Sequence, residues 1–239
     1  MENKQINNMK RSKKINDEGL QNLSSNLEKC NNLSTLKLEL RNNLFGSLGV
    51  SSLGSALANC QNLQYLCIDL YYNQIGAQSV SNLIQNLEKC IYLEKLELWV
   101  DCQVDEQSPQ NMYSSLANFR NLSFIKLYLE ENNLDDLQIS NLGFTLTNCS
   151  QLSTLKISLY NNNIGPQGIS NLGSSLKMCP YLSSLALSLK RQGHIRLKFL
   201  SSKLPQTLLI RTQLQEKCLE SRKIWHDDPK TLQSQIFIY

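Results

Sequence analysis

The chain repeats one pattern of hydrophobic and polar positions with a period of about 30 residues. In each copy, leucine or isoleucine first alternates with other residues, as in LSTLKISL at 152–159. Alternation with a period of two predicts a half-buried strand. Apolar residues then recur at i, i+3 and i+7, as at Ile169, Leu172 and Leu176, and this spacing predicts one buried face of a helix. We therefore expect one strand and one helix in each unit.

In most units a cysteine follows the helical part. The equivalent positions are Cys30, Cys60, Cys90, Phe119, Cys149 and Cys179, and each is followed three residues later by leucine. A position that accepts phenylalanine indicates apolar volume rather than a reactive thiolate, and cysteine is among the residues most often buried. No C-x-x-C or C-x-x-H pair occurs that would favour zinc. The sequence therefore predicts that these cysteines pack in a core.

A single strand and helix cannot enclose a core, whereas stacked units bury a continuous one, as in a solenoid. The frame L-x-x-L-x-L-x-L-x-x-N-x-F runs from Leu33 to Phe45 and recurs at Leu63–Ile75 and Leu152–Ile164. It resembles the leucine-rich repeat family, with one x-L pair added before the asparagine. An insertion of two residues keeps every later strand side chain on its original face. The long helical half is similar to the ribonuclease-inhibitor-like subclass, and the richness in Asn, Gln and Ser is similar to that of ciliate arrays, some of which accompany protein kinases.

This resemblance implies an α/β leucine-rich repeat solenoid of about six repeats, with a parallel sheet on the concave face and helices on the convex face. It also implies a structural ladder of asparagine side chains that bond neighbouring backbone groups. We assign that ladder to Asn43, Asn73, Asn132 and Asn162. The third unit departs from the frame, because Gln103 lies near the asparagine position and Pro109 falls within the expected helix. A short or broken helix is expected there.

Charge and patterning divide the chain into three parts. Residues 1–14 form a basic tail with five Lys or Arg and one Glu, residues 15–207 form the array, and residues 208–239 form an irregular, basic cap or tail. The array is expected to begin with a helix that has no clear strand before it. Its middle is acidic, with nine basic and fifteen acidic residues over 15–189. The formal net charge of +4 for the whole chain therefore conceals basic ends and an acidic middle.

Several classes of function find no support in the sequence. No apolar stretch approaches the roughly 18 residues of a membrane span, and no secretory signal is recognised. We expect a cytoplasmic protein, with KRSKK at 10–14 as a weak alternative signal for nuclear import. Gly-x-x-Gly at 46–49 and 165–168 lacks the continuation of a phosphate-binding loop, and HDD at 226–228 is interpreted as a turn before Pro229. We expect no catalysis, no cofactor and no metal.

A candidate protein-binding surface follows from the strand alternation. Residues between the buried leucines point away from the core and form columns across successive strands. The candidate binding residues are Tyr65, Asp69, Tyr71, Glu97, Trp99, Asp101, Phe124, Tyr128, Glu130 and Tyr160. Exposed aromatic residues framed by charge mark binding surfaces. The alternative is that aromatic residues favour strands and cover one another across neighbouring coils.

The sequence thus favours a non-catalytic protein–protein interaction module, or scaffold, that binds a peptide or protein on its concave face. The acidic residues of this surface favour a basic partner. Two alternatives stay open: a regulatory segment of a larger signalling enzyme such as a protein kinase, and nucleic-acid binding through the basic termini, which carry no recognised nucleic-acid module. We expect no membrane partner. The sequence indicates neither the partner's identity nor the oligomeric state.

Overall fold

The computed structural model describes residues 15–102, 108, 111–189, 210–212 and 236–238, the last two ranges by backbone alone. Strands and helices alternate along the chain. The helices are α1 (Asp17–Leu27), α2 (Ser47–Leu57), α3 (Ala77–Leu87), α4 (Asp136–Thr147) and α5 (Pro166–Leu176), with the 3-10 helix η1 (Ser114–Asn118) between α3 and α4. The strands are β1 (Thr35–Glu39), β2 (Tyr65–Asp69), β3 (Lys95–Trp99), β4 (Phe124–Tyr128), β5 (Thr154–Ser158), β6 (Ser184–Ser188), β7 (Ile210–Thr212) and β8 (Ile236–Ile238).

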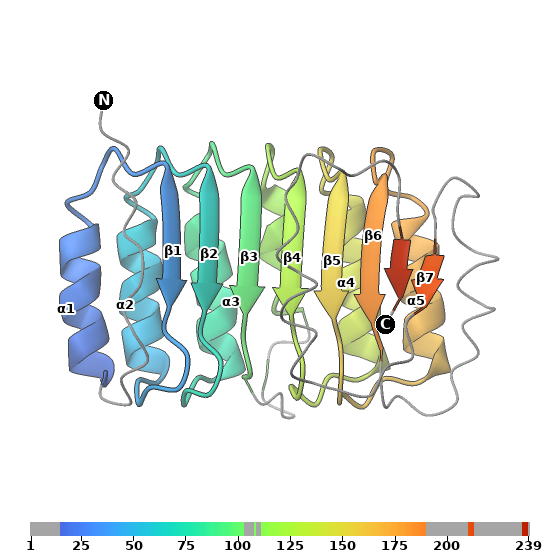
Figure 1. The fold of residues 1–239 in the computed structure, drawn as a ribbon, viewed down its shortest axis with the longest axis horizontal. Coiled ribbons are helices and arrows are strands. Elements are labelled where there is room, and N and C mark those ends of the chain that lie inside the picture. Colours follow the sequence, from blue (N-terminus) through green and yellow to red (C-terminus); the bar gives the residue numbers. More distant parts are fainter. Residues whose placement is uncertain (1–14, 103–107, 109–110, 190–209, 213–235, 239) are drawn as a thin grey trace.

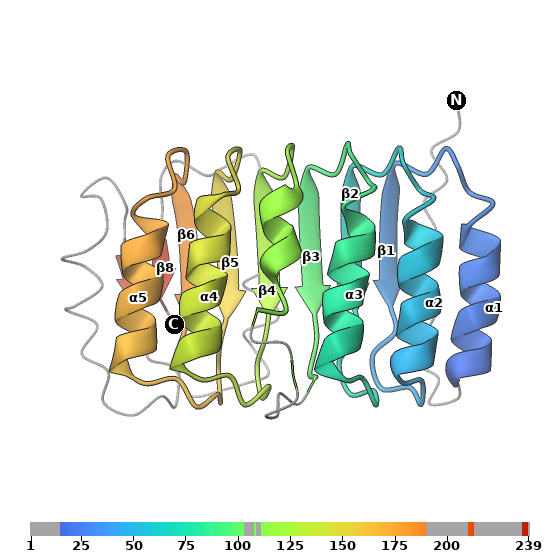
Figure 2. The ribbon, with the colours of Figure 1, turned by 180° about the vertical axis from the view of Figure 1, so that it is seen from behind.

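All eight strands lie in one parallel sheet, in the order β1-β2-β3-β4-β5-β6-β8-β7. Figure 1 shows the strands side by side, and Figure 2 shows the helices together on the opposite side of the sheet. Strand residues pair in register, so that Tyr65 lies beside Lys95 and Lys95 lies beside Phe124. The predicted strand columns are therefore confirmed from β1 to β6. The predicted tail at 1–14 and residues 190–209 lie outside the described part, whereas β7 and β8 show that the segment at 208–239 adds two strands.

The core lies between the sheet and the helices. The alternate leucines and isoleucines of strands β1 to β6 are buried there, as at Leu36, Leu38 and Leu40, and so is the apolar face of each helix. Cys60, Cys90, Phe119, Cys149 and Cys179 are buried in the same core, whereas Cys30 is partly exposed. An open parallel sheet with helices on one face, built from coils of about 30 residues, is an α/β solenoid of the leucine-rich repeat type.

The third unit has a short helix, as predicted. Its helix is η1, five residues of 3-10 helix, where the other units have α-helices of eleven or twelve residues. Met112, Tyr113 and Leu116 fill the core at this level. Gln103 and Pro109, on which the prediction rested, lie outside the described residues.

The starts of α2, α3 and α5 are capped from the preceding coil. Asp17 Oδ1 accepts hydrogen bonds from the N–H groups of Gly46 and Gly49, both at 2.8 Å, at the start of α2. A Cβ at Gly49 would lie only 2.8 Å from that oxygen, so the Gly-x-x-Gly spacing makes room for the carboxylate. Asp136 repeats the arrangement at Gly165, with an N···O distance of 2.6 Å. Helix α4, which follows the unit with the short helix, is instead capped by its own Asp135 in a capping box.

Two ladders of side chains connect the coils. The amide of Asn73 accepts from Asn43 N–H at 3.1 Å and donates to Leu40 of the preceding coil at 3.0 Å. Asn132 and Asn162 bond neighbouring coils in the same way. The thiols of four of the repeated cysteines, Cys60, Cys90, Cys149 and Cys179, each donate to a carbonyl of the preceding coil, as from Cys90 to Leu57 at 3.2 Å. The Leu57 carbonyl, at the end of α2, also accepts from the Cys60 N–H at 2.9 Å, so the Cys90 thiol is its second donor.

Candidate functional site

The candidate site lies on the face of the sheet opposite the helices, which we call the open face. At its centre the side chains of Trp99 and Tyr128, on the neighbouring strands β3 and β4, are stacked with ring centroids 4.7 Å apart and an interplanar angle of 12°. Both side chains are partly exposed. The ammonium group of Lys126 lies 5.1 Å from the Trp99 ring and 5.4 Å from the Tyr128 ring. The structure thus forms an aromatic pair with an adjacent cation, and its two rings cover one another across neighbouring coils as the alternative from the sequence expected.

A charged network lies beside this pair. Glu97 forms an ion pair with Lys126 at 3.1 Å, and the Tyr65 hydroxyl donates to the same carboxylate at 3.0 Å. Lys126 is 5% exposed although it belongs to a column that we expected to face solvent. Burial, followed by the nearby charge of Glu97, raises the pKa of Tyr65. Tyr65 and Glu97 are therefore held in place by each other rather than projecting freely.

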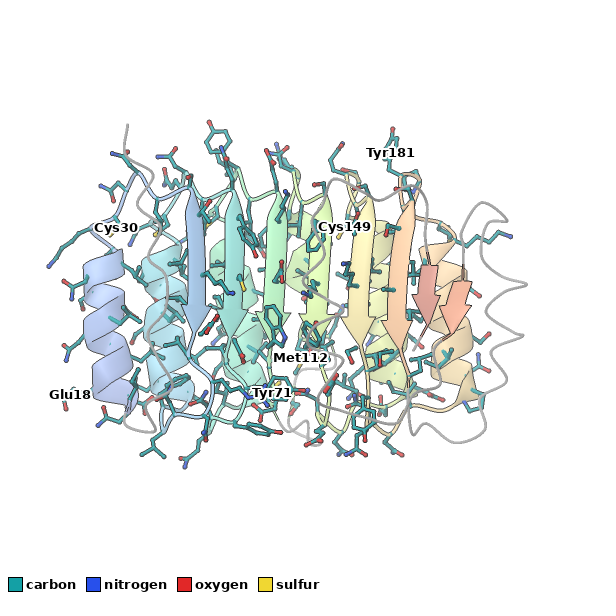
Figure 3. The ribbon with its side chains drawn as sticks, viewed as in Figure 1. Glu18, Cys30, Tyr71, Met112, Cys149 and Tyr181 are labelled. Carbon is teal, nitrogen blue, oxygen red and sulfur yellow. The ribbon has the colours of Figure 1, made fainter. Side chains whose placement is uncertain are left out.

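Tyr71 is not the exposed residue that the sequence predicted, because its side chain is 5% exposed. Its hydroxyl donates to the Glu130 carbonyl at 2.8 Å, and the guanidinium of Arg41 lies 5.2 Å from its ring centre. Asp69 accepts a hydrogen bond from the Tyr71 N–H at 3.0 Å. Figure 3 shows Tyr71 near the C-terminal ends of the strands. The expectation that Tyr71 itself is an accessible contact is therefore wrong, since its long side chain lies along neighbouring coils and packs against them.

Asp101 lies at the same end of the strands. Its Oδ2 accepts from the Tyr72 N–H at 2.7 Å, whereas Oδ1 is buried and has no hydrogen-bond partner within the described residues. Burial raises the pKa of Asp101 from 3.8 to about 6, and the Tyr72 N–H and the charge of Arg41 act in the opposite direction. Asp101 therefore titrates near neutral pH while it holds the Tyr72 backbone.

The remaining predicted residues lie at the edges of the site. Phe124 has the Lys156 ammonium group 5.9 Å from its ring centre, and Glu130 accepts a hydrogen bond from the Ser158 hydroxyl. Tyr160 is partly exposed at the end of β5. All ten predicted residues thus lie on or just beyond β2 to β5, but their carboxylates are engaged in contacts within the chain. The structure brings Tyr65, Glu97, Trp99 and Tyr128 together most closely, through Lys126.

Three residues of this surface were absent from the predicted site. Lys126 is one, and its position opposite Glu97 in the strand register was a signal in the sequence. Arg41 and Tyr72 are the others, and the guanidinium of Arg41 lies 4.5 Å from the exposed Tyr72 ring. Tyr72 adopts a left-handed backbone conformation with φ of 57°, as Asn42 and Asn161 do at the equivalent positions. Such a φ is uncommon for a bulky residue, so tyrosine at this asparagine position was the available signal.

The described residues do not favour nucleophilic or metal chemistry. Burial raises the pKa of the Cys67, Cys90, Cys102 and Cys149 thiols to about 12, so they are protonated at neutral pH. No group of three or more His, Cys, Asp or Glu side chains in the described ranges could hold a metal ion.

Within the same ranges, no helix combines the length and the apolar character needed to cross a bilayer.

Comparisons with known proteins find similarity among solved structures. No protein-family model matches the chain, and no curated protein matches it. Among solved structures, it is similar to internalin C2 from Listeria monocytogenes, with 22% sequence identity and a TM-score of 0.37. The match covers 75% of this chain and 72% of that one. A likeness at this level carries no information about what the present chain binds.

Proposed function

We propose that the chain is a non-catalytic module that binds a peptide or protein on its open face. The observation that carries this proposal is the partly exposed stack of Trp99 on Tyr128. The solenoid does not require these rings, because Ser158 and Ser188 occupy the same column in β5 and β6. Tryptophan and tyrosine supply much of the binding energy at protein interfaces.

The stacked pair is held rigidly. Lys126 lies beside both rings and is itself fixed by Glu97, which also accepts from Tyr65. Side chains that are already ordered lose less conformational entropy when a partner binds. The network around Lys126 therefore favours binding by the aromatic pair.

A partner with basic groups is favoured by the charge around the pair. Asp69, Asp101 and Glu130 lie on neighbouring coils at the C-terminal ends of the strands. Asp69 and Asp101 accept from backbone N–H groups, which carry no full positive charge, and complementary charge steers encounter and selects partners. Binding should accordingly weaken as the salt concentration rises.

The experiment compares three forms of the chain as baits in quantitative affinity purification from the source cells. The forms are the wild type, the double variant Trp99→Ala and Tyr128→Ala, and the control Tyr181→Ala. Tyr181 is 64% exposed and lies near the N-terminal ends of the strands, whereas Tyr71 lies near their C-terminal ends (Figure 3). A partner retained by the wild type and the control but reduced at least about tenfold on the double variant supports the proposal. Equal recovery on all three would contradict it, provided that circular dichroism shows the same fold.

The cytoplasmic location and the ribonuclease-inhibitor-like subclass stay predictions from the sequence. No observation on the described residues favours a regulatory role in a larger enzyme. Nucleic-acid binding through the termini stays a prediction, because residues 1–14 and most of 208–239 lie outside the described part.

A further inference from the structure

Charged residues of opposite sign occupy opposite halves of the open face. Each of the strands β1 to β5 contributes two outward positions in its N-terminal half and two at or just beyond its C-terminal end, and the strand register aligns these positions in columns. Over these five strands, the two N-terminal columns contain four cations and one anion, which are Lys37, Lys95, Lys126, Lys156 and Glu97. The two C-terminal columns contain four anions and one cation, which are Glu39, Asp69, Asp101, Glu130 and Arg41. The open face is therefore positive toward the N-terminal ends of these strands and negative toward their C-terminal ends.

The ion pairs on this face do not remove the separation of charge. The Lys126 ammonium group pairs with Glu97 at 3.1 Å, and both residues belong to the N-terminal columns. The pair of Lys37 with Glu39, also at 3.1 Å, takes one charge from each half. Each pair is neutral, so the N-terminal columns keep an excess of cations and the C-terminal columns an excess of anions.

The stacked rings of Trp99 and Tyr128 lie between these excess charges. Lys95 is exposed on the same strand as Trp99, toward the N-terminal end. Asp69 is the register partner of Trp99 in β2 and is partly exposed, and the partly exposed Glu130 follows Tyr128 toward the C-terminal end. A ligand that contacts the rings can therefore reach a cation on one side and carboxylates on the other.

The separation of these charges sets a length for such a ligand. A strand rises about 3.3 Å per residue, so Lys95 and Asp101 lie about 20 Å apart along β3 and its extension, and the columns of Lys156 and Glu130 lie about 13 Å apart. An extended peptide has the same rise per residue, so opposite charges about four to six residues apart would match both halves. A segment that crosses the strands would instead follow a single half and meet mostly one sign of charge.

We propose that the open face binds an extended bipolar segment of a partner protein, which lies along the strands. Its acidic residues contact Lys95 and Lys156, an aromatic residue contacts the stacked rings, and its basic residues contact Asp69 and Glu130. Complementary charges at both ends fix the register of the segment and reject segments of a single sign. This inference rests on the proposed function, because it takes the open face as the binding surface, and it adds that basic groups alone do not suffice.

The test uses three synthetic fluorescein-labelled peptides and measures their binding to the full-length chain by fluorescence anisotropy at low salt. EEGSWSGRR is bipolar, ERGSWSGRE has the same composition with mixed ends, and RRGSWSGRR is basic at both ends. The variant Lys95→Glu with Lys156→Glu makes the N-terminal columns acidic. Its matched control is Lys89→Glu with Lys177→Glu, which changes the net charge equally at exposed lysines that follow α3 and α5. Circular dichroism verifies that the variants fold.

We expect the wild type and the matched control to bind the bipolar peptide at least about tenfold more tightly than either other peptide. The Lys95→Glu, Lys156→Glu variant should reverse this preference and bind the doubly basic peptide most tightly. Equal binding of the bipolar and mixed peptides to the wild type, or binding of neither, would overturn the inference.

Two further outcomes separate this inference from the proposed function. If the doubly basic peptide binds the wild type most tightly and loses its binding to the Trp99→Ala, Tyr128→Ala variant, the bipolar segment is overturned while the aromatic binding site stands. If the bipolar peptide binds that aromatic variant as tightly as the wild type, both are overturned, since the rings then contribute nothing to binding.

Discussion

Asp17 caps a helix to which it does not belong, because its carboxylate accepts from the Gly46 N–H at the start of the next helix in the chain. Glycine at the start of α2 has no side chain that could cap the helix itself. Asp136 serves α5 in the same way, and the Ser47 hydroxyl accepts from Gly76 at the start of α3. A residue in one coil thus stabilises the helix of its neighbour, which makes folding of adjacent coils interdependent.

Replacing Asp17 with alanine should lower the free energy of unfolding by about 1–2 kcal/mol, because two N–H groups at a helix start lose a charged acceptor. Urea unfolding followed by circular dichroism measures this change. Glu18→Ala is the control, since Glu18 is acidic and exposed in the same first turn and has no described bond to α2. If both variants lose the same stability, the cross-coil cap is not the cause.

Replacing Lys126 with methionine should destabilise the protein by about 2–4 kcal/mol, since it leaves the Glu97 carboxylate in a largely buried position without its cation. The double variant Glu97→Gln and Lys126→Met should recover most of this loss. Lys95→Met, at an exposed position of the neighbouring column, should change stability by less than about 0.5 kcal/mol. Urea unfolding gives the free energy of unfolding of these three variants and of the wild type. A double variant no more stable than Lys126→Met would contradict the explanation.

Asp101→Asn should stabilise the protein at neutral pH but not at pH 4. Between pH 4 and 6 an unfolded Asp101 loses its proton while the folded one, with a pKa of about 6, keeps it, so wild-type stability falls as pH rises. The asparagine variant lacks this contribution, and its advantage should grow to about 1 kcal/mol above pH 6 once solvent screening is allowed for. Unfolding free energies of the two proteins at pH 4, 5, 6 and 7 give the comparison. A constant difference across this range would show that Asp101 is not the titrating group.

Cysteine labelling should distinguish the first coil from the rest. Cys90 and Cys149 are buried with pKa values of about 12, so iodoacetamide should alkylate them at pH 8 far more slowly than the partly exposed Cys30. Peptide mapping by mass spectrometry gives the rate for each cysteine. In urea all three should react at similar rates. Rapid alkylation of Cys90 in the folded protein would contradict its assignment to the core.

The sequence sufficed for the solenoid because its apolar positions follow the periods of strand and helix in every unit except the third. Leu36, Leu38 and Leu40 were assigned to the core from alternation alone, and the structure buries all three. The strand columns followed as well, since equal spacing between repeats leaves one register. The short third helix was predicted from a break in that spacing.

Exposure on the open face could not be predicted in the same way. Alternation tells which side of the sheet a residue occupies, but it does not tell whether a long side chain stands upright or lies across its neighbours. Tyr71 lies across to Glu130, two coils away, and Lys126 is buried between Glu97 and the aromatic pair. Such contacts depend on the side-chain lengths in several coils at once, so no single repeat contains the information.

The 3-10 helix η1 gives the array a mechanical asymmetry. Helices α1, α2 and α3 pack in one row, and α4 packs on α5, whereas η1 provides a thinner contact between the two rows. The sheet crosses the same level without a break, through β3 and β4. Bending should therefore concentrate between α3 and α4, with the strands of Trp99 and Tyr128 as its axis. A partner that contacts both rings should restrict this bending. Amide hydrogen exchange in η1 should then slow when the partner binds.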